Sequence, residues 1–473
     1  MSKRNFYVDI LPIHPEVTGS CFYCSIRYPD FSTQQFIVDC GLFQEKKYQK
    51  LNETLPFKCN ELDFVLVTHN HADHTGRLPM VVSNGYTGDI HCTNLTKELS
   101  NKGLINSCEI MYNDAGKGKG PILYTSSDLP VTFSLMKGHD YEKTFSINEN
   151  VKVTFLQNGH LFGAASILLQ VFYENEEPIN ILFAGDYNDK NVFFEVKKLP
   201  EWVKRLPLTI VQEATYGDTK SEDINNVFET NLIQAMENKN CTCVIPVFAL
   251  GRSQEILLKL KNMQDEKILD KDIPIYLDGT LAIQYTNILL KHSDTFFESS
   301  KDFLPNNFRF VHKTSRDSII KSTTRKIILT TSGMGSFGPA PLYFSKYFSN
   351  PNALIHFVGY ATEGTLARKL SDAAEGESVK IQGMNQEKKA KVFHTNEFSA
   401  HAKADTMLNF LKEFSNIKLV LINHGQTETK KNFAKAVEKE IPCKEISIQD
   451  VSQLHRIGSY GLIKSFDSIQ KSS

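Results

Sequence analysis

The sequence lacks any long apolar run. Its longest apolar stretches, such as ILLQVFY at 167–173, fall far short of the roughly 18 residues that a membrane-spanning helix needs. The opening stretch MSKRNFYVDILPIHP also lacks the uninterrupted apolar core of a secretory signal. We therefore expect a cytoplasmic protein that makes no membrane contact.

The sequence also lacks a disulfide framework and an excess of positive charge. Its nine cysteines are an odd number scattered between Cys21 and Cys443, which favours a reducing compartment and buried thiols. Lys and Arg number 53 against 54 Asp and Glu, so no overall positive field attracts nucleic acid. A polyanionic substrate would have to be attracted by a local cleft or by bound metal ions.

Strands and helices alternate along the whole chain. The 473 residues contain no internal repeat or low-complexity tract, and this length with 41% hydrophobic content permits two well-packed domains. Short β-branched runs predict a strand-rich first part, longer helices between buried strands follow from about residue 218, and short strands return after residue 381. The pattern predicts an α/β protein with an α/β module inserted into a β-sandwich-like domain, with boundaries near 210 and 385.

The stretch VTHNHADHTG at 67–76 concentrates side chains that bind metals. His69, His71, Asp73 and His74 follow the apolar run FVLV, at the predicted end of a strand. Imidazole and carboxylate suit Zn²⁺, and the H-x-H spacing places two rings on the same side of an extended segment. A polar, histidine-rich surface turn is the alternative interpretation.

Two further candidate ligands follow predicted strands. His160 lies beside Gly159 and close to Gly163, which let the backbone and a metal approach closely, and Asp186 follows the apolar run ILFA. Either residue alone is compatible with ordinary turn chemistry. Together with the histidine-rich loop they indicate an open metal site, in which Asp186 can bridge two ions. Asp39, in FIVDCG, is expected to hold an imidazole in the required tautomer.

In chain order, these motifs resemble those of the metallo-β-lactamase superfamily. The resemblance rests on DCG at 39–41, H-x-H-x-D-H at 69–74, His160 and Asp186. Glu213 in VQEATYGD, His401 in EFSAHA and His424 in INHGQ resemble the motifs of its β-CASP branch of nucleases, and the likeness covers nearly the whole chain. It implies an αββα sandwich formed by residues 1–209 and 385–473, with a β-CASP domain inserted at 210–384.

The resemblance also implies ligands for two Zn²⁺ ions. One ion is expected to bind His69, His71, His160 and Asp186, and the other Asp73, His74, His424 and the same Asp186. A hydroxide that bridges two ions about 3.5–4 Å apart is the expected nucleophile for phosphodiester hydrolysis, with Asp73 counted among the catalytic residues. The implied products carry a 5′-phosphate and a 3′-hydroxyl.

His401 and Glu213 are the expected proton-transfer pair. A leaving alkoxide needs a proton, and a carboxylate such as Glu213 would orient His401 and raise its pKa. Alternatively, Glu213 pairs locally and His401 only starts a helix. The resemblance favours RNA over DNA, because a histidine such as His424 is typical of the RNA-processing members. Gln426 stands where many relatives carry Glu, without loss of a metal ligand.

Three other residues are expected to contact the substrate. Arg252 in ALGRSQE begins a predicted helix, and Ser332 and Gly333 lie in the turn TTSGMGSFG. An ordinary strand-to-helix turn explains both segments equally well. The expected partner is single-stranded RNA, cut by an endonuclease or a 5′-exonuclease that acts as a monomer or a simple homodimer.

Other functions use parts of the same pattern. A small-molecule metallo-hydrolase of lactamase or thioesterase type would need the metal ligands, but neither Glu213 and His401 nor the inserted module. A DNA nuclease of the same superfamily would usually carry an aliphatic residue in place of His424. A non-catalytic scaffold should have lost ligands, and none is missing from this sequence. The sequence therefore favours a ribonuclease.

Overall fold

The chain folds into two compact units. The computed structural model describes residues 6–14, 16–118, 120–223, 227–359, 361, 363–450 and 453–467. The first unit contains the chain up to Asn191, the segment Val196–Ser221 and the chain from His401 onward, and the second contains Val192–Glu195 and Glu222–Ala400. The first unit is therefore built from segments that lie far apart in the sequence.

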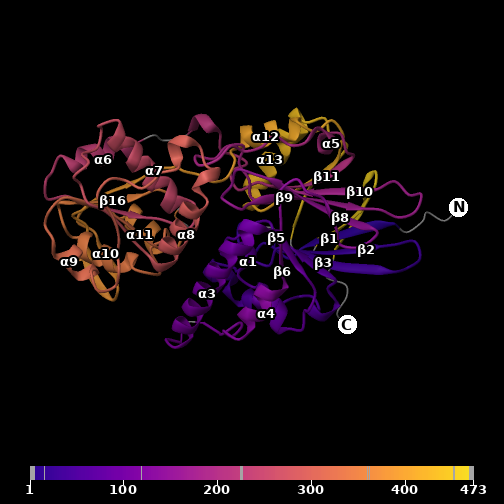
Figure 1. Cartoon of the computed structure of the whole chain (residues 1–473), viewed down its shortest axis with the longest axis horizontal. Helices are drawn as coiled ribbons and strands as arrows, with labels where there is room; N and C mark the ends of the chain where they lie inside the picture. Colours follow the sequence, from indigo (N-terminus) through magenta and orange to yellow (C-terminus); the bar gives the residue numbers. More distant parts are fainter. Residues whose placement is uncertain are drawn as a thin grey trace. The chain divides into compact units, whose positions relative to one another are not determined.

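Two mixed sheets form the centre of the first unit (Figure 1). One has the order β23-β22-β1-β2-β3-β4-β5-β6, with β1 (Tyr7–Pro12), β2 (Phe22–Arg27), β3 (Thr33–Val38), β4 (Phe64–Leu66), β5 (Ile90–Thr93), β6 (Met136–His139), β22 (Gln453–Gly458) and β23 (Gly461–Asp467). The other has the order β21-β20-β11-β10-β9-β8-β7, with β7 (Phe145–Ser146), β8 (Val151–Gln157), β9 (Ala165–Val171), β10 (Ile179–Phe183), β11 (Leu208–Glu213), β20 (Ile417–Asn423) and β21 (Ile446–Ile448).

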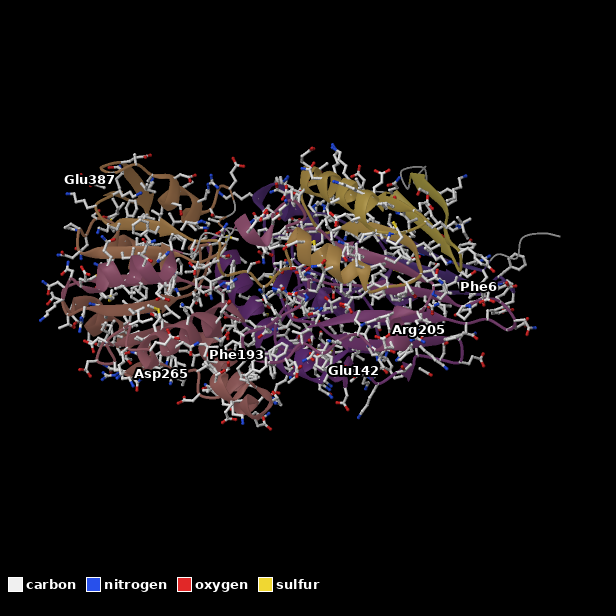
Figure 2. The ribbon with its side chains drawn as sticks, turned by 90° about the horizontal axis from the view of Figure 1, so that it is seen from above. Phe6, Glu142, Phe193, Arg205, Asp265 and Glu387 are labelled. Atoms are coloured by element: carbon white, nitrogen blue, oxygen red, sulfur yellow. The ribbon has the colours of Figure 1, made fainter. Side chains whose placement is uncertain are left out.

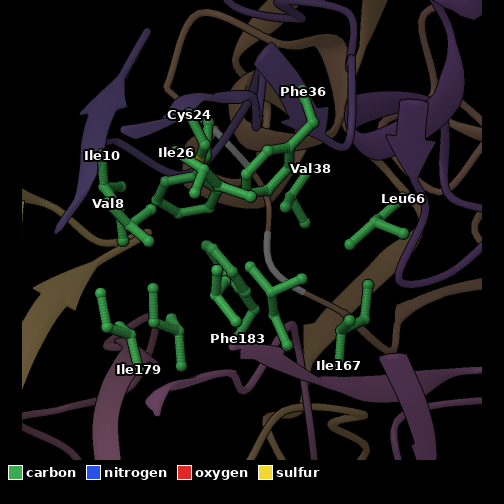
Figure 3. Close-up of a cluster of buried hydrophobic side chains, with 14 of the residues drawn as sticks. Val8, Ile10, Cys24, Ile26, Phe36, Val38, Leu66, Ile167, Ile179 and Phe183 are labelled. Atoms are coloured by element: carbon green, nitrogen blue, oxygen red, sulfur yellow. The ribbon is translucent and has the colours of Figure 1, made fainter. Parts of the chain in front are cut away.

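The main core lies between these two sheets. Side chains alternate along each strand, so β2 turns Phe22, Cys24 and Ile26 inward and leaves the residues between them partly exposed. In the close-up of Figure 3, side chains of β1, β2 and β3 face Ile167 of β9 and Phe183 of β10. Burial of this apolar surface stabilises the sandwich.

Helices cover the outer faces of both sheets. The first sheet packs against α1 (Ala72–Thr75), α2 (Leu78–Ser83), α3 (Asn94–Ala115) and α4 (Asp128–Leu135), with the short 3₁₀ helices η1 (Lys46–Glu53) and η2 (Cys59–Glu61) nearby. The second packs against α5 (Glu201–Lys204), α12 (Ala404–Lys412) and α13 (Thr427–Glu440). These four layers confirm the predicted αββα sandwich.

The second unit is a parallel α/β module. Its six-stranded sheet has the order β14-β13-β15-β12-β16-β19, with β12 (Thr242–Pro246), β13 (Ile275–Asp278), β14 (Phe308–Phe310), β15 (Lys326–Thr330), β16 (Ala353–Phe357) and β19 (Lys391–His394). The helices are α6 (Phe228–Met236), α7 (Arg252–Asp265), α8 (Thr280–Lys291), α9 (Arg316–Lys321), α10 (Ala340–Tyr347) and α11 (Leu366–Asp372), and β17 (Ser378–Ile381) pairs with β18 (Met384–Glu387). Asp265 and Glu387, labelled in Figure 2, end α7 and β18.

The two compact units and the predicted domains use different boundaries. The main segment of the second unit begins after Ser221 and ends before His401, and β19 pairs with β16 inside this unit. A contact-based unit and an inserted domain are different definitions, so the limits at 210 and 385 stay a prediction. Among the helices of the described residues, none is both long and apolar enough to cross a bilayer.

Candidate metal centre

The predicted ligands lie where strands end. β10, β11 and β20 are parallel neighbours, so their carboxyl ends meet at one edge of the sheet. Glu213 is the last residue of β11, and Asp186 and His424 follow β10 and β20. In the other sheet β3 and β4 are also parallel neighbours, and Asp39 and His69 follow them. The alternation of strands thus delivers these side chains to one place.

The first cluster consists of His69, His71, His160 and Asp186. Each residue offers one nitrogen or oxygen atom, and these atoms lie within 4.8 Å of one another. Nε2 of His160 is 3.2 Å from Nδ1 of His71, and Nε2 of His69 is 3.7 Å from Oδ2 of Asp186. The structure therefore brings together the four residues that the family resemblance assigns to one ion.

The second cluster consists of Asp73, His74 and His424, again with donor atoms within 4.8 Å. Asp186 lies between the clusters: its Oδ2 is 3.3 Å from Nε2 of His74, and its Oδ1 is 3.3 Å from Nδ1 of His424. One carboxylate thus faces both groups, as a bridging ligand must. A third set, Asp186, Glu213 and His424, has the same close spacing, which the sequence does not predict.

A metal ion fits this donor set chemically. Nε2 of His69, His74 and His424 and Oδ1 of Asp186 are buried and make no hydrogen bond to any described residue. Burying polar atoms without partners costs free energy, so four such atoms in one place indicate a bound group that accepts their lone pairs. Imidazole and carboxylate donors of this kind are typical ligands of Zn²⁺.

Burial keeps two of the imidazoles neutral. It lowers the pKa of His69 well below its usual value, and neighbouring histidines add to the effect. Burial also lowers the pKa of His71 to about 4, although the Asp73 carboxylate opposes this shift. A histidine must be neutral to bind a metal, so both rings are ready to do so at neutral pH.

Asp39 fixes the orientation of His74. Its Oδ2 accepts a hydrogen bond from Nδ1 of His74 at 2.7 Å, and both its oxygens accept bonds from Thr68. With its proton on Nδ1, His74 turns Nε2 toward Asp186. Burial opposes a charge on His74, but the carboxylates of Asp186 and Asp39 outweigh it and raise its pKa well above the usual value. A metal ion that binds Nε2 of His74 would therefore displace a proton from it.

The backbone is strained at two of these positions. Asp39 and His424 have φ angles of 60° and 47°, in the left-handed region that few residues other than glycine adopt. Gly41 is required by close approach, because an added Cβ would lie 1.5 Å from the carbonyl oxygen of Asp73. The DCG motif therefore has a steric reason as well as a chemical one.

His401 and Glu213 lie in direct contact. Nδ1 of His401 is 3.0 Å and 3.2 Å from the two carboxylate oxygens of Glu213, and its Nε2 is 3.9 Å from Oδ2 of Asp186. Burial alone would lower the pKa of His401, but the charges of Glu213 and Asp186 and the hydrogen bond to Glu213 raise it to about 9. The ring is thus protonated at neutral pH and lies beside the metal ligands. His401 precedes α12 by three residues and does not start it.

Two threonines belong to the site although no motif marks them. Thr68 donates to Asp39 and lies 3.1 Å from Nδ1 of His69. Thr215 Oγ1 is 3.2 Å from Nδ1 of His424 and bonds to the His424 carbonyl. Thr68 directly follows the apolar run FVLV, whereas Thr215 follows Glu213 and Ala214, so nothing in the sequence links either threonine to a ligand. Gln426, where the resemblance leads one to expect Glu, is the residue before the first turn of α13.

The residues expected to contact substrate lie in the second unit. Arg252 begins α7 after β12, and Ser332 and Gly333 follow β15, which is the parallel neighbour of β12. They therefore share one edge of the six-stranded sheet. The Arg252 guanidinium bonds to Glu255, so part of its charge is compensated within the helix. Their contact with substrate stays a prediction.

Three family models match the chain in sequence order. Residues 32–121 match the metallo-beta-lactamase superfamily, 253–370 match the Beta-Casp domain, and 385–448 match the Zn-dependent metallo-hydrolase RNA specificity domain. The first match contains the histidine-rich loop and the last contains His401 and His424.

Curated relatives show the same likeness over most of the chain. A transcription termination factor, FttA, of Methanosarcina mazei is 29% identical over 90% of this chain and 68% of its own length. An RNase J-like protein of Methanocaldococcus jannaschii is 27% identical over 89% of this chain and 95% of its own length. A ribonuclease of Thermus thermophilus is 27% identical over 87% of this chain and 91% of its own length.

The order of the family matches agrees with the fold and with the cluster of histidines and aspartates. A metallo-β-lactamase match, a Beta-Casp match and a metallo-hydrolase RNA specificity match follow one another along the chain. The αββα sandwich carries the candidate ligands at its strand ends. The chain therefore belongs to the β-CASP branch of the metallo-β-lactamase superfamily and is a metal-dependent hydrolase.

Proposed function

We propose that this protein is a zinc-dependent ribonuclease that hydrolyses RNA to products with a 5′-phosphate and a 3′-hydroxyl. One observation carries the proposal: Asp186 lies between two histidine-containing clusters, and the protonated imidazole of His401 lies beside it. Metal ligands and a proton donor are thus combined in one buried site, which is what phosphodiester hydrolysis needs.

The ligands divide between two ions. One Zn²⁺ would be held by His69, His71, His160 and Asp186, and the other by Asp73, His74, His424 and Asp186. Ions bound there would activate a water molecule and neutralise charge on the scissile phosphate. Asp39 and Thr68 hold His74 and His69 in the orientation that this binding requires.

His401 is the proton donor in this proposal. Nδ1 is engaged by Glu213, so Nε2 is the atom that can give a proton to the leaving 3′-oxygen. Glu213 is itself fixed by the backbone N–H groups of Tyr187, at 3.0 Å, and Thr215, at 3.4 Å. This support keeps the imidazole in one orientation, so Glu213 acts through the position and charge of His401.

RNA is the proposed substrate for two reasons. Residues 385–448 match an RNA specificity domain, and two of the relatives are named as a ribonuclease and an RNase J-like protein. The contacts expected at Arg252, Ser332 and Gly333 also suit the binding of a single RNA strand. Single-stranded RNA, a cytoplasmic location and a monomeric or homodimeric state are parts of this proposal.

The decisive test is digestion of RNA labelled at one end, with the products sized over time. We expect cleavage by the zinc-loaded protein, loss of cleavage with a chelator, and recovery on adding Zn²⁺ but not Mg²⁺. A metal analysis should give two ions per chain, and Asp73→Ala should abolish cleavage while the fold is retained. Products with a 3′-phosphate, or cleavage that survives complete metal removal, would disprove the proposed chemistry.

The same preparation separates the other candidate functions. A β-lactam, a thioester and single-stranded DNA of the same sequence are offered beside the RNA. Rapid turnover of the β-lactam or the thioester with no cleavage of RNA would favour a small-molecule hydrolase, and preference for DNA would favour a DNA nuclease. The size distribution of the RNA products also distinguishes internal cleavage from stepwise removal of nucleotides at the 5′ end.

A further inference from the structure

An aromatic ring lies exposed at the carboxyl edge of the second unit's sheet. Phe248 belongs to the loop between β12 and α7, and 37% of its surface is exposed. Its carbonyl oxygen accepts hydrogen bonds from the backbone N–H and the hydroxyl of Ser253, at 3.2 Å and 2.6 Å. Ser253 is fully buried in the first turn of α7, so the helix holds this loop in place.

Two glycines lie against the ring. A Cβ built on Gly333 would lie 3.1–3.3 Å from three ring carbons of Phe248, and one built on Gly359 would lie 3.6 Å from the ring. The ring therefore packs against backbone with no side chain between them. Gly333 follows β15 and Gly359 follows β16, the two strands that flank β12, so three adjacent loops build the support.

Polar groups that suit a nucleotide lie in the same loops. Arg252 is four residues after Phe248, and Ser332 precedes the supporting Gly333. Ser332 Oγ and Arg252 Nε are buried and make no hydrogen bond to the described residues. The aromatic ring, the guanidinium and the hydroxyl thus belong to one sheet edge, where ligands of parallel α/β sheets bind.

We infer that Phe248 is a stacking platform for an unpaired base of the RNA substrate. The inference rests on the proposed function and adds to it a reason for preferring single strands. A ring that packs against glycine backbone and keeps 37% of its surface exposed can stack on a base face, whereas the base faces of a duplex are covered by their neighbours. Glycine support and the fixed loop hold the ring ready before RNA binds.

The first test measures binding of a fluorescent single-stranded RNA to metal-free protein. Because a base stacked on an aromatic side chain contributes about 1–3 kcal/mol, Phe248→Ala should weaken binding about 5- to 150-fold. Phe248→Trp should bind as tightly as the wild type, since it keeps an aromatic face. Phe297→Ala is the matched control, because Phe297 is a phenylalanine of the same unit with 42% of its surface exposed. It should bind normally.

The second test shows that a base, and not general packing, contacts the ring. Single abasic sites are placed in turn along the RNA, and each RNA is bound to wild-type and Phe248→Ala protein. At one position the abasic site should weaken binding to the wild type by the same factor as the substitution, and should not weaken binding to Phe248→Ala further. This lack of additivity identifies the stacked base.

The outcomes are separable. A wild type that binds and cleaves RNA while Phe248→Ala keeps full affinity overturns the platform alone. Equal losses for Phe248→Ala and Phe297→Ala, or abasic effects that add to the substitution at every position, also overturn it. A wild type that neither binds nor cleaves RNA overturns the proposed function and the platform with it. Thermal unfolding of each variant excludes loss of the fold as the cause of weaker binding.

Discussion

At the scale of single residues, the position of His401 determines how the site can move a proton. The ring lies between the carboxylates of Glu213 and Asp186, and the charges of both raise its pKa to about 9 although burial lowers it. An acid acts only while it is protonated, so kcat should fall as pH rises through the pKa of His401, which bound Zn²⁺ moves below about 9 because the ions offset the charge of Asp186. His401→Gln should lower kcat about 10²- to 10⁴-fold.

Glu213→Gln tests the origin of that pKa. Removing the carboxylate charge destabilises the imidazolium, so the alkaline limb of the kcat profile should move to lower pH. Single-turnover rates across the pH range measure this shift. Glu142→Gln, in an exposed loop of the same unit, is the control and should leave the profile unchanged. An unshifted alkaline limb in Glu213→Gln would separate Glu213 from the proton transfer.

Asp39 gives a prediction about metal affinity. Its carboxylate accepts a hydrogen bond from Nδ1–H of His74 at 2.7 Å, whereas the amide of Asp39→Asn can turn its NH₂ group toward the ring and favour the other tautomer. We expect metal affinity to fall about 10- to 100-fold, since changes in such supporting partners have effects of this size. Titration against a competing chelator measures it, with the exposed Asp30→Asn as control. Unchanged affinity would mean that Thr68 and Asp186 suffice to orient His74.

At the scale of strands and helices, the sequence predicts most of the frame of the site. β-branched runs mark the strands, and the polar motif after each run marks the loop, so Asp186 and His424 could be assigned to strand ends from the sequence alone. The confirmed sandwich and parallel module follow from the same periodicities. What could not be predicted depends on pairing in space: Thr68 and Thr215 are common residues whose hydrogen bonds to ligands leave no pattern. The short strand 391–394 likewise gives no sign that it pairs with β16.

β16 contains a buried histidine that makes the second unit sensitive to acid. His356 is fully buried next to Phe228, at 5.0 Å between rings, and neither ring nitrogen bonds to a described residue. Burial, and then the charge of His394, lower its pKa from 6.5 to about 4. Between these two values the unfolded chain binds a proton that the folded chain does not. His356 therefore costs no stability above the unfolded pKa, and the free energy of unfolding decreases as the pH falls from there toward 4.

His356→Phe should remove this part of the pH dependence. By linkage, protonation of His356 should lower the free energy of unfolding by about 2 kcal/mol between neutral pH and pH 5, because pH 5 lies well below the unfolded pKa of 6.5 and above the folded pKa of about 4. Urea unfolding of wild type and variant at both pH values gives the difference directly. His312→Phe, at an exposed position, is the control. If the two proteins lose stability equally on acidification, His356 is not the group that titrates.

At the scale of the whole molecule, the first unit is completed only when the chain returns to it. His401 is the first residue of the returning segment, which is anchored at once by hydrogen bonds from Ala402 N–H to the Tyr187 carbonyl, at 2.7 Å, and from Ala404 N–H to the Thr219 carbonyl, at 2.9 Å. The proposed acid is thus positioned by backbone contacts with the segment that carries Asp186 and Glu213. Because the entropic cost of closing a loop grows only slowly with its length, a long insertion is tolerated there as long as both ends stay in the sandwich.

All seven proposed ligands belong to the first unit, so metal binding should stabilise that unit alone. A ligand at 100 times its dissociation constant adds about 2.7 kcal/mol, which raises the midpoint of a unit of this size by about 4 °C. The chain has a single tryptophan, Trp202, which lies in α5 of the first unit and reports on its unfolding. On chelation, the tryptophan fluorescence transition should move to lower temperature. Circular dichroism also reports the unfolding of the second unit, which tryptophan fluorescence does not, and that part of its transition should stay at the same temperature. Equal shifts of both signals would show that the units unfold together, and no shift in either would place the metal ligands elsewhere.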